Sequence, residues 1–238
     1  MRGQKVLKVS CEGKPVCTAL QNLLLDVMWQ KGRPKLYQPV DAPEVAKWPL
    51  NRKCSDRAEK IMQFLSSQDM LPPKACTYLD VGSSYGWFVA QMEKAGFRSF
   101  GIERDPIAIE IGKVSYSIDP SRIYQDECGL FFASHNNCYD VVSCFSVLHH
   151  FVLNKGTVSA TEFIGLVDRV TKRTLFLDTG QNDESWFKDS LKEWDIDFIE
   201  KWILSHTSFT RAYRLGFDQD RVPPFESNYR RMLFAFSK

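Results

Sequence analysis

Short apolar runs alternate with amphipathic stretches through the middle of the chain. The apolar runs predict strands near 77–81, 99–103, 122–124, 139–145 and 173–178. Apolar residues at helical spacing predict helices over 86–95, near 106–116 and near 158–170. Strands separated by helices are typical of an α/β fold with a parallel, doubly wound sheet.

The two ends of the chain do not continue the regular alternation of strand and helix patterns. Residues 6–9 predict a short strand and residues 16–30 an amphipathic helix, followed by a loop with several prolines. Ser55 or Asp56 is expected to cap another helix. We therefore expect residues 1–70 to form an extension over the active site, and residues 71–238 to form the main domain. Beyond the central region, one or two helices are expected within 185–202 and a strand within 230–236.

A glycine turn joins the first two central strands through a helix. Gly82 and Gly86 bracket a polar turn after the first strand, and Glu103 stands at the tip of the second, 21 positions after Gly82. The order is strand, glycine turn, helix, strand, acid. This order predicts a βαβ unit that holds a nucleoside, with Glu103 accepting hydrogen bonds from ribose hydroxyls.

The turn also discriminates among nucleoside cofactors. A dinucleotide site needs glycine where this chain has Ser84 and Trp87, so that backbone can approach a pyrophosphate. A phosphate-binding Gly-Lys-Ser/Thr pattern is absent as well. S-adenosylmethionine (SAM) carries ribose and adenine without phosphate, and it tolerates a bulkier turn.

Three segments, 80–86, 101–105 and 139–151, resemble the ordered motifs of class I SAM-dependent methyltransferases. The resemblance covers roughly residues 76–178, and one departure is Ser84, where the family often has glycine. It implies a mostly parallel seven-stranded sheet that ends in an antiparallel pair, with an N-terminal helical extension. It also implies SAM as the cofactor.

The resemblance further implies a set of residues that bind the cofactor: Asp80, Gly82, Ser83, Ser84, Gly86, Glu103, Arg104, Asp126 and Ser146. Backbone amides of the glycine turn are expected to face the methionine carboxylate. Asp80 either holds the turn together or reaches the cofactor's amino group. Asp126 either lies near the adenine amino group or caps the helix that follows it.

Candidate catalytic residues follow the fourth and fifth strands, at the edge where open α/β sheets bind ligands. His149 and His150 are candidate general bases; in the alternative, one imidazole caps a loop and the other packs. Asp178 either contacts the acceptor or caps the next helix. An aromatic and cationic set in the N-terminal part suits an anionic or sugar-bearing acceptor or simply packs over the sheet: Tyr37, Trp48, Arg52, Lys53 and Arg57.

Amino-acid composition bears on the compartment and the partners of the protein rather than on its chemistry. A net charge of +2 with 25% charged residues favours neither nucleic acid nor a membrane surface. No apolar run is long enough to span a membrane, and the first residues lack the apolar core of a signal peptide. Seven cysteines without a CxxC pair indicate free thiols in a reducing compartment, so a cytoplasmic protein without a metal site is expected.

Together these patterns predict transfer of a methyl group from SAM to an oxygen or nitrogen of a small-molecule or sugar acceptor. Near-neutral charge argues against RNA, but a transferase acting on transfer RNA stays an alternative. A protein that binds SAM without catalysis is the second alternative, and a dehydrogenase is a distant third.

Overall fold

A computed structural model describes residues 20, 22–26, 35–40, 42, 45–71, 75–223 and 228–238. The strand predicted over 6–9 and most of the helix predicted over 16–30 lie outside these residues. Residues 20 and 22–26 are helical.

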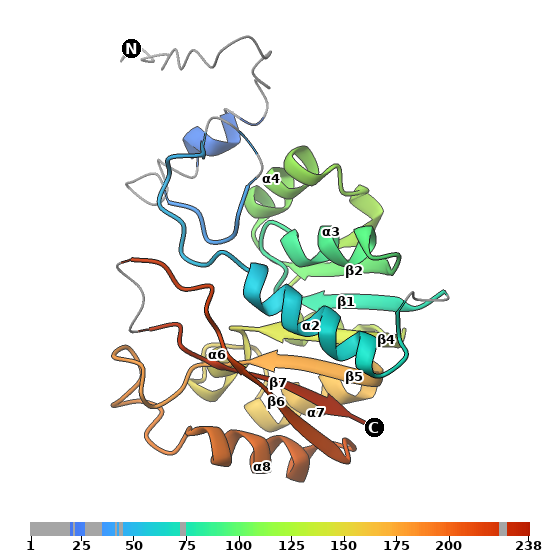
Figure 1. Cartoon of the computed structure of the whole chain (residues 1–238), viewed down its shortest axis with the longest axis vertical. Helices are drawn as coiled ribbons and strands as arrows, with labels where there is room; N and C mark the ends of the chain where they lie inside the picture. Colours follow the sequence, from blue (N-terminus) through green and yellow to red (C-terminus); the bar gives the residue numbers. More distant parts are fainter. Residues whose placement is uncertain are drawn as a thin grey trace.

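The centre of the molecule is a seven-stranded sheet with the order β3-β2-β1-β4-β5-β7-β6 (Figure 1). Strands β1 to β5 run parallel, and β7 pairs antiparallel with both β5 and β6. The predicted doubly wound sheet and its terminal antiparallel pair are confirmed. The strands are β1 Thr77–Val81, β2 Arg98–Glu103, β3 Ile123–Gln125, β4 Tyr139–Phe145, β5 Thr171–Asp178, β6 Arg211–Phe217 and β7 Met232–Ser237.

Helices cover both faces of this sheet. The described helices are α2 Ser55–Ser67, α3 Trp87–Lys94, α4 Pro106–Tyr116, α5 Cys128–Ser134, α6 Leu148–Val152, α7 Ala160–Val170 and α8 Ile196–His206. The sequence predicted α3, α4 and α7 closely. It missed α6, which is short, and β6, whose residues are only partly buried. The helix expected after Asp126 in one alternative exists as α5, but its N-cap is Glu127.

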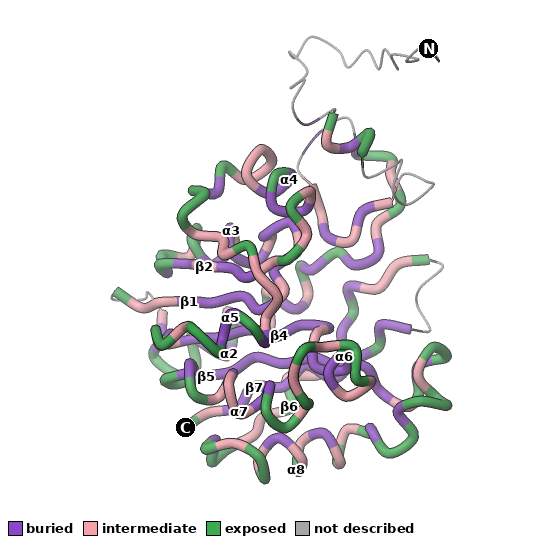
Figure 2. Tube along the Cα trace, turned by 180° about the vertical axis from the view of Figure 1, so that it is seen from behind, coloured by how far each residue is buried: buried purple, intermediate pink, exposed green. Residues whose placement is uncertain are grey.

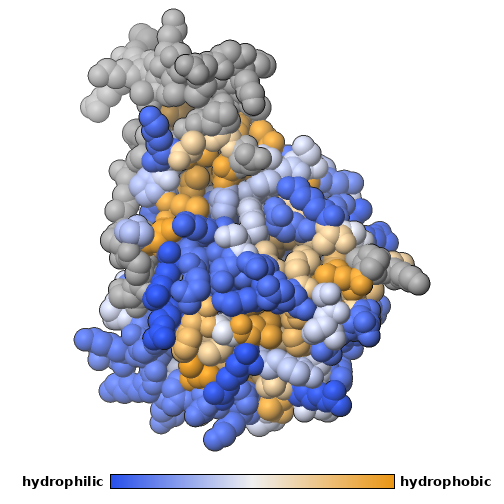
Figure 3. All heavy atoms as spheres, in the orientation of Figure 1, coloured by the Kyte–Doolittle hydropathy of each residue, from blue (hydrophilic) through white to orange (hydrophobic). Residues whose placement is uncertain are grey.

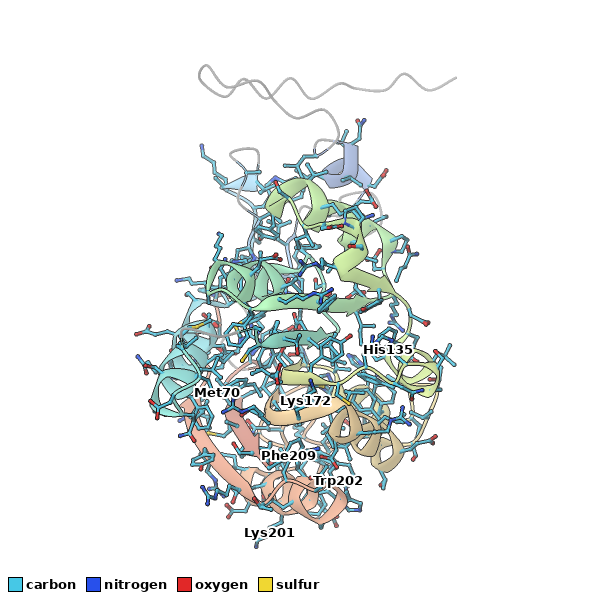
Figure 4. The ribbon with its side chains drawn as sticks, turned by 90° about the vertical axis from the view of Figure 1, so that its right-hand side faces the viewer. Met70, His135, Lys172, Lys201, Trp202 and Phe209 are labelled. Carbon is cyan, nitrogen blue, oxygen red and sulfur yellow. The ribbon has the colours of Figure 1, made fainter. Side chains whose placement is uncertain are left out.

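Continuous apolar strands are buried on both faces, which is what a parallel sheet between two helical layers requires. On one face Tyr78 and Phe176 pack with Phe64 of α2 and Phe88 of α3. The other face carries the larger cluster, in which α5, α7 and α8 cover β1, β4, β5 and β7. Trp202 of α8 and Phe209 just after it belong to this second layer (Figure 4). Strands β1, β4, β5 and β7 are buried along most of their length (Figure 2).

Helix α2 belongs to the same core as the sheet. Its Ile61, Phe64 and Leu65 are buried against β1, β5 and β7, and its outward face carries polar residues (Figure 3). The predicted cap at Ser55 or Asp56 is wrong, because the carboxylate of Asp220 accepts the N–H groups of Asp56 and Arg57 at 2.8 and 3.2 Å. A cap supplied from the other end of the chain joins α2 to the β6–β7 connection.

The N-terminal segment packs on α4 and the glycine turn rather than on the open sheet. Leu20, Leu24 and Leu36 are buried in one cluster with Tyr85 of the turn and Ile111 of α4. This cluster places residues 35–40, 42 and 45–51 beside the ends of β1 and β2, where the candidate site lies.

Candidate active site

The glycine turn follows β1 and has a strongly constrained backbone. Gly82 and Gly86 have φ of +74° and +75°, and Ser84 adopts a left-handed φ of +51°. A Cβ on Gly82 would lie 2.5 Å from Cγ2 of Val147, so only glycine fits there without displacing that side chain. The turn therefore brings bare backbone to the carboxyl edge of the sheet.

Glu103 ends β2 and faces this turn. Its Oε2 accepts a hydrogen bond from the backbone N–H of Ser84 at 2.8 Å, and its Oε1 accepts one from the N–H of Asp105 at 2.8 Å. Two backbone donors thus fix the carboxylate in one orientation. Each oxygen keeps capacity to accept a further hydrogen bond.

A cavity of about 640 Å³ opens at this edge of the sheet. One part of its wall comes from the ends of β1, β2 and β3, and another from the segment after β4. Aromatic and basic side chains from distant segments complete it. The lining includes Tyr37, Gly82, Ser84, Glu103, Arg104, Asp126, Glu127, Cys128, Ser146, His149, His150, Lys155, Trp186, Phe187, Tyr229 and Arg231.

Eight of the twelve residues predicted for the site line this cavity. They are Gly82, Ser84, Glu103, Arg104, Asp126, Ser146, His149 and His150. The other four are Asp80, Ser83, Gly86 and Asp178, and they do not belong to its lining. Ser83 turns inward, where a Cβ on Gly101 would lie 2.6 Å from its Oγ. Gly86 occupies the N-cap position of α3.

Asp80 lies inside the molecule rather than at the cavity. Its carboxylate accepts a hydrogen bond from Oγ of Ser143 on β4 at 2.6 Å, and Ser143 in turn contacts the hydroxyl of Tyr78 at 2.5 Å. Burial raises the pKa of Asp80 to about 7. Strand alternation directs the Asp80 side chain toward the α2 and α3 layer and away from the cavity. Of its two predicted roles, this geometry favours holding the turn together over reaching the cofactor's amino group.

Asp178 stands behind the cavity wall and is saturated with hydrogen bonds. It accepts Nη2 of Arg52 at 2.9 Å, Nη1 of Arg57 at 3.2 Å and the backbone N–H of Ser146 at 2.9 Å. The two guanidinium groups hold its pKa well below the usual range of a carboxyl, despite burial. It therefore orients Ser146 and the arginines instead of meeting an acceptor.

These contacts belong to a larger buried ion network. Arg57 also forms an ion pair with Asp220 at 3.3 Å, and Arg52 forms one with Asp218. Arg231 donates two hydrogen bonds to Glu184, of 2.7 and 2.9 Å. All of these charged side chains are at most 3% exposed. Removing one partner of such a network leaves an uncompensated buried charge, so the network fixes the segments that carry it.

The two histidines of α6 have different surroundings. His149 is buried and its Nδ1 accepts the backbone N–H of Gly180 at 3.2 Å, whereas His150 is exposed. Burial, Arg231 and His150 lower the pKa of His149 to about 2. Partial burial of its imidazole and the cations Lys155, Arg104 and Arg231 lower the pKa of His150 too. Both imidazoles are neutral at pH 7.

Sequence reasoning missed most of the wall built by the second half of the chain. Trp186 and Phe187 come from the turns after β5, and Tyr229 and Arg231 come from the segment before β7. The guanidinium groups of Arg52 and Arg231 each lie 5.1 Å from the centre of the Tyr229 ring. Within the predicted N-terminal set, Tyr37 lines the cavity, Arg52 and Arg57 belong to the ion network, and Trp48 and Lys53 do not line the cavity.

The described part of the chain contains no metal cluster, disulfide or membrane-spanning helix. No group of three or more metal-ligating side chains is assembled there. The five cysteines described are free thiols. None of the described helices combines the length and apolar character needed to cross a membrane.

Comparison with known proteins agrees with this architecture. Residues 50–158 match a family model described as a methyltransferase domain. No curated protein matches the chain. The solved structure of the bifunctional kinase-methyltransferase WbdD has a TM-score of 0.70 at 17% identity, over 92% of this chain and 46% of that one. The chain thus spans less than half the length of WbdD.

Two further solved structures share the fold. Magnesium protoporphyrin IX methyltransferase (ChlM) from Synechocystis PCC 6803 with bound SAM has a TM-score of 0.52 at 17% identity, over 77% of this chain and 79% of that one. The methyltransferase domain of bacterial CtHen1-CN has a TM-score of 0.54 at 18% identity, over 76% of this chain and 97% of that one. The methyltransferase-domain match covers slightly less than half of the chain, and the seven-stranded sheet order agrees with the fold of these solved methyltransferases, so the chain has the fold of class I SAM-dependent methyltransferases.

Proposed function

We propose that the chain transfers the methyl group of SAM to an oxygen or nitrogen of a small-molecule or sugar acceptor. The observation that carries the proposal is the position of Glu103. Its carboxylate is held by two backbone N–H groups on the wall of a cavity that also contains His149 and His150. A nucleoside recognised by Glu103 and an acceptor near the histidines would share one cavity.

The residues at the β1 and β2 ends fit a nucleoside without phosphate. Two oxygens of Glu103 retain acceptor capacity, which matches the two donors of a ribose diol. The backbone at Gly82 is bare because a Cβ would meet Val147. Arg104 and Asp126, which line the same cavity, can contact the polar edge of adenine. Asp80, Ser83 and Gly86 would act on the cofactor only by shaping the turn.

When bound, SAM supplies a methyl group on a positively charged sulfur. The chain's own contribution is mainly placement, because a displacement of this kind depends on holding the reacting atoms in line. Ser146, fixed by Asp178, and the imidazoles of α6 lie on the same cavity wall and can orient an acceptor there. A neutral hydroxyl or amine acceptor must also lose a proton.

We assign that proton to His150 rather than His149. The Gly180 N–H occupies Nδ1 of His149, and a neutral imidazole then carries its hydrogen on Nε2. His149 can therefore donate a hydrogen bond to the acceptor but has no free lone pair. The imidazole of His150 makes no hydrogen bond to a described residue, and its lowered pKa leaves a lone pair available at neutral pH.

The aromatic side chains of the wall support a ring-shaped acceptor. Phe187 lies 4.9 Å from the His149 ring, and Trp186 lies 5.4 Å from Tyr229 in an edge-to-face arrangement. Trp186 remains half exposed at 50%. Flat apolar faces with polar tips suit a sugar or another small ring better than a long charged polymer.

Calorimetry with SAM and with S-adenosylhomocysteine, followed by a labelled-methyl assay, tests the proposal. Small molecules and sugars are offered in one pool and transfer RNA in another. We expect both nucleosides to bind and the label to enter the first pool. Label in the RNA would contradict the acceptor class, binding without transfer to either pool would favour a non-catalytic protein, and no binding would contradict the site.

A further inference from the structure

A second cavity of about 310 Å³ adjoins the first, on the side of the N-terminal segment. The two cavities share Tyr37, Ser84 and Glu103. The rest of the second wall comes from the N-terminal segment, the glycine turn and the start of α4. It consists of Lys35, Asn51, Tyr85, Asp105 and Ala108. We refer to it as the Asn51–Tyr85 cavity.

Two buried polar atoms in this wall are poorly satisfied by the described residues. Oδ1 of Asn51, whose residue is 8% exposed, has no partner there, and the hydroxyl of Tyr85, whose residue is 3% exposed, has only the backbone N–H of Tyr37 beside it. An unsatisfied buried polar atom is costly. Such atoms are unusual in a native structure, where buried polar groups are nearly always bonded to protein, water or ligand.

The chemistry of these atoms indicates what would satisfy them. The Asn51 oxygen needs a donor, and the Tyr85 hydroxyl both donates and accepts. The backbone N–H of Tyr37 lies beside that hydroxyl, so another donor borders the same space. A hydroxyl group donates and accepts at once. Neighbouring hydroxyls on one ring could therefore meet Asn51 and Tyr85 together.

Charges in the wall favour a neutral occupant. Lys35, Glu103 and Asp105 line the cavity together, and both carboxylates already have backbone partners: Asp105 caps α4 by accepting the N–H of Ile107 at 2.9 Å, and Glu103 accepts the N–H of Asp105. An added anion would face two carboxylates, and an added cation would face Lys35. The volume far exceeds the roughly 30 Å³ that one water occupies.

We infer that the Asn51–Tyr85 cavity binds a neutral polyhydroxyl group, such as one sugar ring of the acceptor. The inference rests on the proposed function, because it names a subsite for the acceptor of that reaction. Tyr37, which lines both cavities, would then contact the acceptor on both sides of the junction.

Saturation-transfer NMR with methyl α-D-glucopyranoside and myo-inositol, on protein saturated with S-adenosylhomocysteine, tests the subsite. We expect the wild type to bind at least one of them. Tyr85→Phe removes only the hydroxyl, so it should keep its melting temperature and bind the polyol about fivefold more weakly. Asn51→Leu should weaken it similarly, while Tyr213→Phe on β6 should leave binding unchanged. Neither cavity variant should change the Kd for SAM measured by calorimetry.

Three outcomes would overturn the subsite. They are a wild type that binds neither polyol, a Tyr85→Phe variant that binds as well as the wild type, and a cavity variant that loses SAM affinity, which would assign the space to the cofactor. Each of these can occur while SAM still binds and the methyl group is still transferred. Failure of the proposed function would instead appear as absent SAM binding or absent transfer in the wild type.

Discussion

The backbone N–H of Gly180 donates a hydrogen bond to Nδ1 of His149, with an N–N distance of 3.2 Å. The loop after β5 thereby fixes an imidazole that belongs to α6. Burial is the main cause that lowers the pKa of this imidazole to about 2. The ring is consequently a hydrogen-bond donor through Nε2 at neutral pH and a poor proton acceptor.

The state of His149 can be observed directly. We expect nitrogen-15 NMR to show the tautomer with hydrogen on Nε2, unchanged from about pH 8 to about pH 5, because a pKa shifted far below 6.5 removes titration from that range. A His149→Gln variant identifies the signal. Observation of hydrogen on Nδ1, or of titration near neutral pH, would contradict the hydrogen bond from Gly180.

His150 should carry the acid limb of the reaction. We expect His150→Ala to lower kcat on the order of 10²–10⁴-fold with an unchanged Kd for SAM, as removal of a general base does. Because its pKa lies below the usual value, the wild type should keep its rate at pH 7 and lose it only at more acidic pH. His206→Ala, exposed on α8, is the control in the labelled-methyl assay. An unchanged rate for His150→Ala would remove it from the mechanism.

Replacement of Glu103 tests the cofactor site. We expect Glu103→Ala to weaken SAM binding by about 1–3 kcal/mol, the loss typical of charge-assisted hydrogen bonds. The variant also leaves the N–H groups of Ser84 and Asp105 without their acceptor. Calorimetry compares it with Glu110→Ala, which removes an exposed carboxylate from α4. Equal affinities for the two variants would refute the placement of the ribose.

The cofactor half of the fold could be predicted because its signals are local. The apolar run before Gly82 became β1, Thr77–Val81, and the proline after Asp105 marked the start of α4, Pro106–Tyr116. Glu103 lines the cavity as expected because a residue at the tip of a parallel strand must face that edge.

The other half of the site depends on contacts between distant segments. Arg231 meets Glu184, 47 residues earlier, and Arg52 meets Asp178, 126 residues later. Neither pair leaves a periodic or short-range signal in the sequence. Asp178 could be placed at the correct strand end, but its hydrogen bonds to two arginines, which turn it away from the cavity, could not be anticipated.

The long-range cap of α2 gives a prediction on stability. Asp220 accepts two backbone N–H groups of α2 and also pairs with Arg57 at 3.3 Å. We expect Asp220→Ala to lower the free energy of unfolding by about 3 kcal/mol, because it removes a cap and leaves Arg57 with fewer partners. Urea denaturation measures the change.

The matched control for Asp220 is Asp195→Ala at the start of α8. Asp195 accepts the N–H of Phe198 at 2.8 Å and forms no ion pair among the described residues. Its loss should cost only about 1 kcal/mol, the usual value of a helix cap. If both variants lost the same stability, the ion pair with Arg57 would contribute nothing beyond capping.

Asp80 should make stability depend on pH in the opposite sense to an ordinary carboxylate. Its native pKa of about 7 exceeds the unfolded value near 4, so between about pH 4 and about pH 7 the native state binds more protons than the unfolded state. Its contribution to the free energy of unfolding therefore falls as pH rises through that window. Asparagine can still accept the Ser143 hydrogen bond but does not titrate.

We therefore expect Asp80→Asn to gain stability relative to the wild type as pH rises from about 4 to about 7, measured by urea denaturation at both values. Asp119→Asn is the contrasting control, because hydrogen bonds from Ser121 lower the pKa of this exposed carboxyl. Its relative stability should change with the opposite sign, and mainly below about pH 4, where the carboxyl of the unfolded state takes up its proton. A pH-independent difference between Asp80→Asn and the wild type would mean that Asp80 is ionised in the folded protein, and that the Ser143 hydrogen bond outweighs burial.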